Sequence, residues 1–166
     1  MSLLIVPLSG RHARGLQTLA ADEPIVPALA SRDDVLGFIV RAQRLRARGA
    51  GAVFAVVEGD HLLGIVVLVR REDVPDHAEL GYWIARPFRD RGHATAAARR
   101  LVAHGFERLR LARIAARCPT ANRAAIRVVE KLGLRFAGVE PAASTASADA
   151  MCRYELGREE WRAGPP

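Results

Sequence analysis

The segment from Ala78 to Leu109 constrains the fold more than any other part of the sequence. Residues 78–85 are typical of a strand, and Pro87 prevents its continuation as a central strand because proline has no N–H to donate to a ladder. From Gly92 to Leu109 apolar residues recur at helical spacing, which predicts a long helix. A strand that passes through a short turn into a helix is therefore expected at the centre of the fold.

Apolar patterns also predict the elements on either side of this segment. Further strands are expected at residues 3–8, 52–58, 61–70, 112–118, 134–139 and 150–156, and further helices at 11–21, about 31–49 and 122–132. Gly59 and Asp60 favour a tight hairpin, and Ser31 with Asp34 resembles a capping box. The order is strand, two helices, three strands, helix, strand, helix, two strands. It predicts an α/β (α+β) fold with a mixed central sheet of about seven strands, in one domain over residues 1–166.

The turn between the central strand and helix has the properties of a phosphate-binding site. It reads Arg89-Asp90-Arg91-Gly92-His93-Ala94, with Thr95 and Ala96 behind it. The first N–H groups of a helix lack intrahelical partners and the helix dipole adds about half a positive charge, so a pyrophosphate can settle there. Gly92 has no Cβ in the way, and Arg89 and Arg91 would add charge-assisted contacts. An arginine-rich turn that enters a helix is more often a solvated surface, so the pattern alone leaves both interpretations open.

Residues 78–138 resemble the GNAT superfamily of acyl-CoA N-acyltransferases. The string RDRGHA at 89–94 is similar to the family's Gln/Arg-x-x-Gly-x-Gly/Ala pyrophosphate signature, and ELGYWI at 79–84 is similar to the strand before it. NRAAIRVVEKLG at 122–133 resembles a helix of the branch that acetylates the N-terminal alanine or serine of ribosomal proteins, and EEW at 159–161 resembles its usual ending. The resemblance implies the GNAT fold and an acetyl-CoA-dependent N-acetyltransferase.

The resemblance also implies which residues contact acetyl-CoA, the co-substrate. It implies no metal ion. Backbone groups of Trp83 and Ile84 would pair with the pantetheine arm like an extra strand. Asn122 would hydrogen-bond the cofactor arm, cap its own helix, or do both. The pyrophosphate would be held by the turn residues Arg89, Arg91, Gly92, His93, Ala94 and Thr95.

The acceptor amine must lose a proton before it attacks a thioester, because an amine with a pKa of about 10 is mostly protonated at neutral pH. Glu79 is the candidate catalytic base, since it stands ten residues before Arg89, where some family members carry a catalytic glutamate. The alternative is that Glu79 pairs with a nearby arginine. His77 is a second candidate base, and a strand amide near Ile84 would stabilise the oxyanion.

Three positions depart from the family pattern. The tyrosine that protonates the leaving thiolate in several members would fall at Val129, the serine of the N-terminal-acetylating branch at Ala125, and the base of another branch at Arg117. Tyr82 and Tyr154 are alternative acids, although a tyrosine in a strand more often packs in the core. An acyl-CoA sensor, or an inactive relative that keeps the cofactor grip, is therefore the alternative function.

Composition weighs against several other classes. A formal charge of +7 would suit nucleic acid, but the arginines are spread over the helices and only 5% of residues are aromatic, so no nucleic-acid partner is expected. The longest uncharged apolar run, 62–69, is too short to cross a bilayer, and the start lacks the features of a secretory signal. A cytoplasmic protein is expected. Cys118 and Cys152 have no partners at metal-ligand spacing and are expected to be core thiols.

The acceptor is expected to be a primary amine, but its identity stays open. A protein N-terminus and a small-molecule amine both fit the resemblance. The family often dimerises through sheet edges or last strands, so a homodimer is also open.

Overall fold

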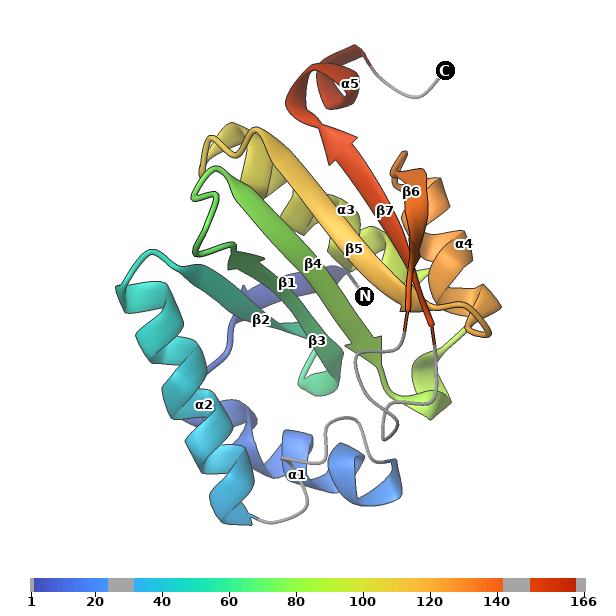
Figure 1. The fold of residues 1–166 in the computed structure, drawn as a ribbon. Coiled ribbons are helices and arrows are strands. Elements are labelled where there is room, and N and C mark those ends of the chain that lie inside the picture. The colour runs from blue at the N-terminus through green and yellow to red at the C-terminus, as the bar shows by residue number, and fades with distance from the viewer. Residues whose placement is uncertain (1, 24–31, 142–149, 164–166) are drawn as a thin grey trace.

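The computed structural model describes residues 2–23, 32–141 and 150–163 (Figure 1). The strands in these residues are β1 (Leu3–Pro7), β2 (Gly51–Glu58), β3 (His61–Arg70), β4 (His77–Ile84), β5 (Arg113–Pro119), β6 (Arg135–Glu140) and β7 (Met151–Gly157). The α-helices are α1 (Ala13–Asp22), α2 (Arg32–Ala47), α3 (His93–Glu107), α4 (Arg123–Lys131) and α5 (Arg158–Ala163). Two short 3-10 turns, η1 (Gly10–His12) and η3 (Arg86–Phe88), precede α1 and α3.

The strands form one seven-stranded sheet in the order β1-β2-β3-β4-β5-β7-β6. β2 and β3 form the expected hairpin, in which Glu58 pairs with His61 across the two turn residues. All neighbouring strands are antiparallel except β4 and β5, which are parallel. The predicted mixed sheet of about seven strands is therefore confirmed.

The parallel pair β4 and β5 separates after only three residue pairs. His77, Ala78 and Glu79 pair with residues 113–115, and beyond them β4 continues to Ile84 while β5 pairs only with β7. On the β5 side, residues 80–84 of β4 therefore have no strand partner within the described chain. Backbone N–H and C=O groups left open inside a sheet are a ready partner for an extended ligand.

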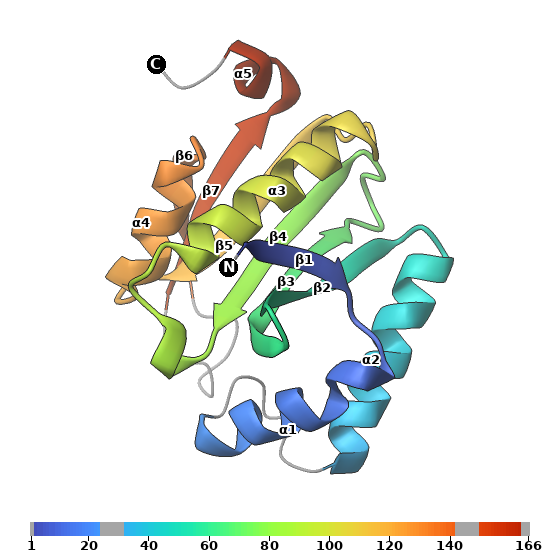
Figure 2. The same ribbon diagram turned by 180° about the vertical axis from the view of Figure 1, so that it is seen from behind.

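Helices cover both faces of the sheet. The larger apolar cluster lies between the sheet and α3 and α4, and includes Leu101, Phe106, Ile114 and Val129. Figure 2 shows α3 crossing this face over β4 and β5. A second cluster, which includes Leu16, Val35 and Ile39, joins α1 and α2 to β2 and β3 on the other face. Between these helices and β6, no described helix covers β5 and β7 on the second face (Figure 1).

The predicted elements lie within a few residues of the observed ones, with one omission. The short helix α5 was not expected, because six residues are too few for an apolar period to show. Tertiary contacts hold it: the Glu160 carboxylate accepts a hydrogen bond from the Gly157 N–H at 2.8 Å, and the Trp161 ring packs 5.9 Å from that of Phe106. The proposed capping box involves Ser31, which lies outside the described residues, as does the linker 142–149.

Candidate active site

The turn after β4 presents the N-terminus of α3 as a set of hydrogen-bond donors. Gly92 is the N-cap residue at φ 80°, and Asp90 also has a positive φ of 60°. The first intrahelical bond from Gly92 O is donated by the N–H of Ala96 at 3.0 Å. The N–H groups of residues 93–95 precede this bond and have no acceptor within the helix. With the helix dipole, they form an end suited to an anion.

This helix end opens into a cavity of about 540 Å³ beside the open part of β4. Its lining comes from the end of α1, the end of β4, the turn and helix α4. Eight of the nine residues expected to contact the cofactor line it: Trp83, Ile84, Arg89, Gly92, His93, Ala94, Thr95 and Asn122. The ninth, Arg91, is exposed and does not line it. The cavity thus joins a helix N-terminus to an unpaired strand edge.

Arg89 holds the turn in place through its side chain. Its Nε donates to the Ile84 carbonyl oxygen at 2.8 Å, and its terminal nitrogen donates to Oε1 of Glu23 at 2.5 Å. These contacts tie the turn to the end of β4 and to the end of α1. The Arg89 guanidinium, which was expected to contact a phosphate, therefore binds protein groups instead. Its main contribution to anion binding would be to hold the turn in shape.

Asn122 caps helix α4, which is one of its two expected roles. Its Oδ1 accepts a hydrogen bond from the Ala125 N–H at 3.0 Å. This contact uses only the oxygen of the side-chain amide. The NH₂ group on the same side chain remains a donor for a ligand in the cavity that Asn122 lines.

Two cations on α4 were missed by the sequence interpretation. Arg127 and Lys131 stand four residues apart on one face of the helix and line the same cavity as the α3 N-terminus. Lys131 is the only lysine in the chain, and its carbonyl oxygen accepts a hydrogen bond from Arg99 on α3 at 3.2 Å. The i, i+4 spacing of two cations was a readable signal. They give the rim of the cavity a positive charge that suits phosphate groups.

Glu79 lies away from this cavity, in an ion pair. Its Oε1 lies 2.8 Å from Nε of Arg117, and the side chain lines a separate hollow of about 430 Å³ together with Val67, Val69 and Gly81. Odd-numbered residues of β4 share the face of the sheet opposite α3. The structure therefore shows the arginine pairing that sequence reasoning held as the alternative for Glu79.

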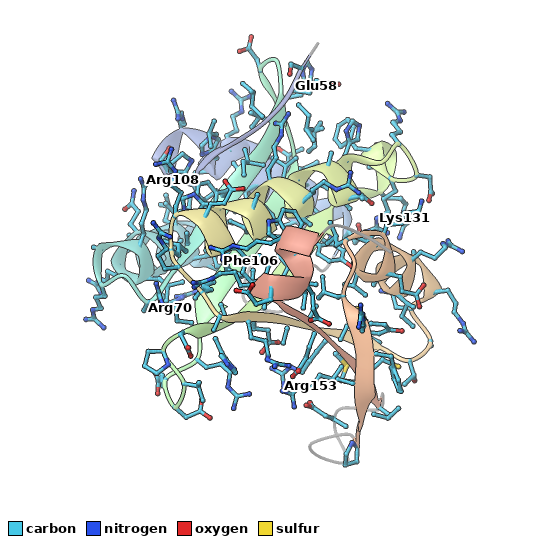
Figure 3. The ribbon with its side chains drawn as sticks, turned by 90° about the horizontal axis from the view of Figure 1, so that it is seen from above. Glu58, Arg70, Phe106, Arg108, Lys131 and Arg153 are labelled. Atoms are coloured by element: carbon cyan, nitrogen blue, oxygen red, sulfur yellow. The ribbon has the colours of Figure 1, made fainter. Side chains whose placement is uncertain are left out.

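The Glu79–Arg117 pair is the end of a ladder of alternating charges on the uncovered face of the sheet. Arg117 also lies 3.7 Å from Glu140, which is 4.0 Å from Arg153. Arg153 pairs with Glu155, which lies 2.6 Å from Arg113. Figure 3 places Arg153 on the side of the sheet away from α3. Burial alone would raise the pKa of Glu155, but the hydrogen bond from Arg113 and the charges of Arg153 and Arg113 together lower it.

The two tyrosines considered as acids are both engaged. The Tyr82 hydroxyl donates to the Ala125 carbonyl oxygen at 2.7 Å, and burial, followed by the neighbouring Cys118, raises its pKa above the usual value. The Tyr154 hydroxyl lies 3.4 Å from Oε1 of Glu130, and burial raises its pKa as well. A hydroxyl whose proton is donated to a carbonyl and whose pKa is raised is a poor proton source. Tyr82 instead ties β4 to α4 across the cavity.

His77, the second candidate base, lies far from the cavity. His77 lies at the paired end of β4, 3.8 Å from Asp76, about 20 Å along the strand from Trp83 at the usual rise per residue. Cys118 is a buried free thiol, as expected, and lies opposite the half-buried free thiol Cys152 in the pairing of β5 with β7.

Within the described ranges, no three His, Cys, Asp or Glu side chains are grouped to hold a metal ion. No described helix is long and apolar enough to cross a membrane.

The fold matches solved acetyltransferases over nearly its whole length. A structure described as a probable acetyltransferase superposes with a TM-score of 0.86 at 26% identity, covering 96% of this chain and 94% of the other. RimL, a ribosomal L7/L12 α-N-protein acetyltransferase solved with coenzyme A, superposes with a TM-score of 0.87 at 16% identity, covering 96% of both chains. At that identity the second match shows the fold alone.

The sequence match identifies the family. Residues 2–135 match the model of the acetyltransferase (GNAT) domain, and the chain belongs to this family. YdaF of Bacillus subtilis (strain 168), named as a candidate ribosomal N-acetyltransferase, is 39% identical over 72 residues, or 43% of this chain. That match spans only 39% of the length of YdaF. The GNAT resemblance drawn from the motifs is therefore confirmed.

Proposed function

We propose that this protein transfers the acetyl group of acetyl-CoA to a primary amine, by direct attack of the amine within a ternary complex. The observation that carries the proposal is the parting of β4 from β5 after Glu79, directly beside the N-terminus of α3. One end of this site suits a pyrophosphate and the other suits an extended amide-containing arm. Acetyl-CoA has both parts, in this order.

Each part of the cofactor has a partner in the cavity. The N–H groups of residues 93–95 would bind the pyrophosphate, and Arg127 and Lys131 would meet its remaining negative charge. The open edge of β4 beside Trp83 and Ile84 would pair with the pantetheine amides like a strand. The Ile84 N–H is the donor there, because Trp83 pairs with Ile65 of β3 and the Ile84 carbonyl accepts from Arg89. The NH₂ of Asn122 would donate to the same arm.

In the reaction, the amine nitrogen forms a bond to the acetyl carbonyl carbon, and the bond from that carbon to sulfur breaks. Coenzyme A leaves as a thiolate and takes up a proton, while the amine gives up a proton to a base. Glu79 is the proposed base, because it faces the open side of the sheet and belongs to the strand that binds the cofactor arm. A backbone N–H at the open edge of β4 would stabilise the oxyanion.

Two measurements test this function. Calorimetry with acetyl-CoA is expected to show binding, and absence of binding at high micromolar cofactor would overturn the proposal. Thiol release is then followed with N-terminal peptides and with small amines as acceptors. Release that depends on an amine supports transfer, whereas binding without release from any amine would favour the non-catalytic alternative. No feature of the described residues favours that alternative.

Three further expectations stay predictions: a cytoplasmic location, a homodimer, and the choice between a protein N-terminus and a small amine. The ribosomal activity in the name of YdaF supports a protein acceptor.

A further inference from the structure

The only two cysteines of the chain lie directly opposite each other in neighbouring strands. Cys118 of β5 pairs with Cys152 of β7, and both are free thiols. Directly opposite residues of an antiparallel pair have their side chains on the same face of the sheet. Here it is the face that α3 and α4 cover, because Cys118 belongs to the apolar cluster there and Cys152 packs against that cluster. The proposed reaction uses neither thiol.

The backbone ladder shows how far apart the two residues stand. Two residues beyond each cysteine, the Thr120 N–H donates to the Ala150 carbonyl oxygen at 3.0 Å. Hydrogen-bonded pairs recur at every second residue of an antiparallel ladder, so the two cysteines also form a hydrogen-bonded pair, with Cα atoms about 5.5 Å apart. A disulfide spans about 4.4–6.8 Å between Cα atoms, but it needs Cβ atoms closer than such a pair gives. A bridge at this place is therefore possible but strained, and strained bridges are readily reduced.

The two thiols differ in their access to solvent. Cys118 is 3% exposed, whereas Cys152 is half-buried. Burial raises the pKa of the Cys118 thiol, the Tyr82 hydroxyl lowers it in part, and the neighbouring Cys152 raises it further. Because an oxidant reacts with an accessible thiolate, Cys152 is the residue that a small oxidant reaches first. Cys118 then stands beside it as the second thiol.

Cys118 also adjoins the wall of the cofactor cavity. It neighbours Tyr82, whose hydroxyl group ties β4 to α4. The turn into α4 starts at the next residue, where the Pro119 carbonyl oxygen accepts a hydrogen bond from the Asn122 N–H at 2.8 Å. Asn122 caps α4 and lines the cavity. A shift of Cys118 toward β7 would therefore disturb the cavity on the α4 side.

We infer that Cys118 and Cys152 form a reversible disulfide when hydrogen peroxide oxidises the protein, and that this bridge weakens the binding of acetyl-CoA. The effect on acetyl-CoA rests on the proposed function, whereas the bridge itself does not. The Cys152 sulfur attacks one peroxide oxygen, the O–O bond breaks, and a sulfenic acid and one water form. The Cys118 sulfur then attacks the sulfenic sulfur, the S–S bond forms, the S–O bond breaks and a second water leaves. The two thiols thus give up two electrons and two protons to one peroxide, and exchange with a thiol such as glutathione reopens the bridge.

Peptide mapping tests the bridge. The reduced protein is treated with equimolar hydrogen peroxide, remaining thiols are blocked with N-ethylmaleimide under denaturing conditions, and trypsin is added. Trypsin releases the two cysteines in different peptides, residues 118–123 and 136–153. These peptides are expected to be linked and unblocked, and to separate after reduction with glutathione. In Cys152→Ser, Cys118 is expected to keep its thiol and take up the blocking group.

Two results would overturn the bridge. In the first, Cys152 of the parent protein becomes a sulfinic acid while Cys118 remains a free thiol. In the second, a non-reducing gel shows that the linked peptides come from two different molecules.

Calorimetry with acetyl-CoA, which has no free thiol to reduce the bridge, tests the effect on the cavity. The Kd is expected to rise about fivefold or more in the oxidised protein and to return to its first value after reduction. Cys152→Ser treated in the same way is the matched control, and its Kd is expected to stay within about twofold. If the bridge forms and the Kd of the parent protein does not change, the effect on the cavity is overturned. If the reduced protein binds no acetyl-CoA, the proposed function fails, while the peptide map still decides whether the bridge forms.

Discussion

The Glu79 carboxylate accepts a hydrogen bond from Nε of Arg117 at 2.8 Å, at the point where β4 and β5 separate. Arg117 stands two residues beyond Ala115, the last residue of β5 that pairs with β4. The ion pair therefore spans the start of the opening between the two strands. It orients the proposed base, and both side chains remain partly exposed, at 40% for Glu79 and 48% for Arg117.

Replacement of Glu79 by Gln tests the base. If Glu79 removes the amine proton, kcat is expected to fall about 10²- to 10⁴-fold, with the Kd for acetyl-CoA within about twofold. Steady-state kinetics across pH 6–9 measures kcat, and calorimetry measures the Kd for acetyl-CoA. Glu140→Gln is the matched control, because Glu140 contacts the same arginine from β6 at 3.7 Å. A similar loss in both variants would mean that the charge ladder, not a base, was disturbed.

Replacement of Gly92 by Ala is expected to weaken cofactor binding. At φ 80° an alanine is strained by about 1–2 kcal/mol, and its Cβ would occupy space beside the helix N-terminus. The Kd for acetyl-CoA, measured by calorimetry, should rise about tenfold or more. Gly133→Ala is the matched control, since Gly133 has φ 88° at the end of α4 and does not line the cavity. If both variants lose the same stability and bind acetyl-CoA with the same affinity, the turn does not bind the cofactor.

Replacement of Tyr82 by Phe separates a structural role from an acidic one. Loss of the hydrogen bond to Ala125 is expected to lower the free energy of unfolding by about 1 kcal/mol. Because the raised pKa and the donated proton make Tyr82 a poor acid, kcat should stay within about fivefold of the parent value, far from the loss of a proton-transfer group. Urea unfolding and steady-state rates measure the two effects. A kcat loss above a hundredfold at unchanged cofactor affinity would restore Tyr82 as the acid.

Replacement of Glu155 by Gln is expected to destabilise the protein in a pH-dependent way. The pKa of Glu155 is lowered in the folded state, so its ion pairs stabilise the fold above the unfolded pKa of about 4.3. This contribution is lost as pH falls through the folded pKa. The free energy of unfolding should therefore drop by about 1 kcal/mol at pH 7 and differ less from the parent value at pH 3. Glu159→Gln, 85% exposed, should change it by less than about 0.5 kcal/mol.

Much of the fold could be predicted because its signals are local. The hairpin at Gly59 and Asp60, the end of β4 before Pro87 and the long helix after Gly92 each follow from a few neighbouring residues. The turn proposed to bind the cofactor could be placed for the same reason, since a helix N-terminus and its turn are adjacent in sequence. Helix α5 could not be predicted, because contacts with Phe106 and Gly157 stabilise it rather than its own apolar pattern.

The ion pairs around the candidate site join residues that are far apart in the chain. Glu23 and Arg89 are 66 positions apart, and Glu79 and Arg117 are 38 apart. The sequence allowed for an arginine beside Glu79 but could not indicate which one, and it suggested no role for Glu23. Such pairs carry no periodic or local signal, because each partner alone is an ordinary charged residue.

By itself the sequence predicted most of the elements, their order and the place of the turn proposed to bind an anion, since hydrophobic period, proline, glycine and helix capping act over a few residues. Only the tertiary structure decided where β4 leaves β5 and which arginine faces Glu79. Those features arise when the sheet forms, because strand register and the burial of side chains depend on contacts between segments that come together only on folding.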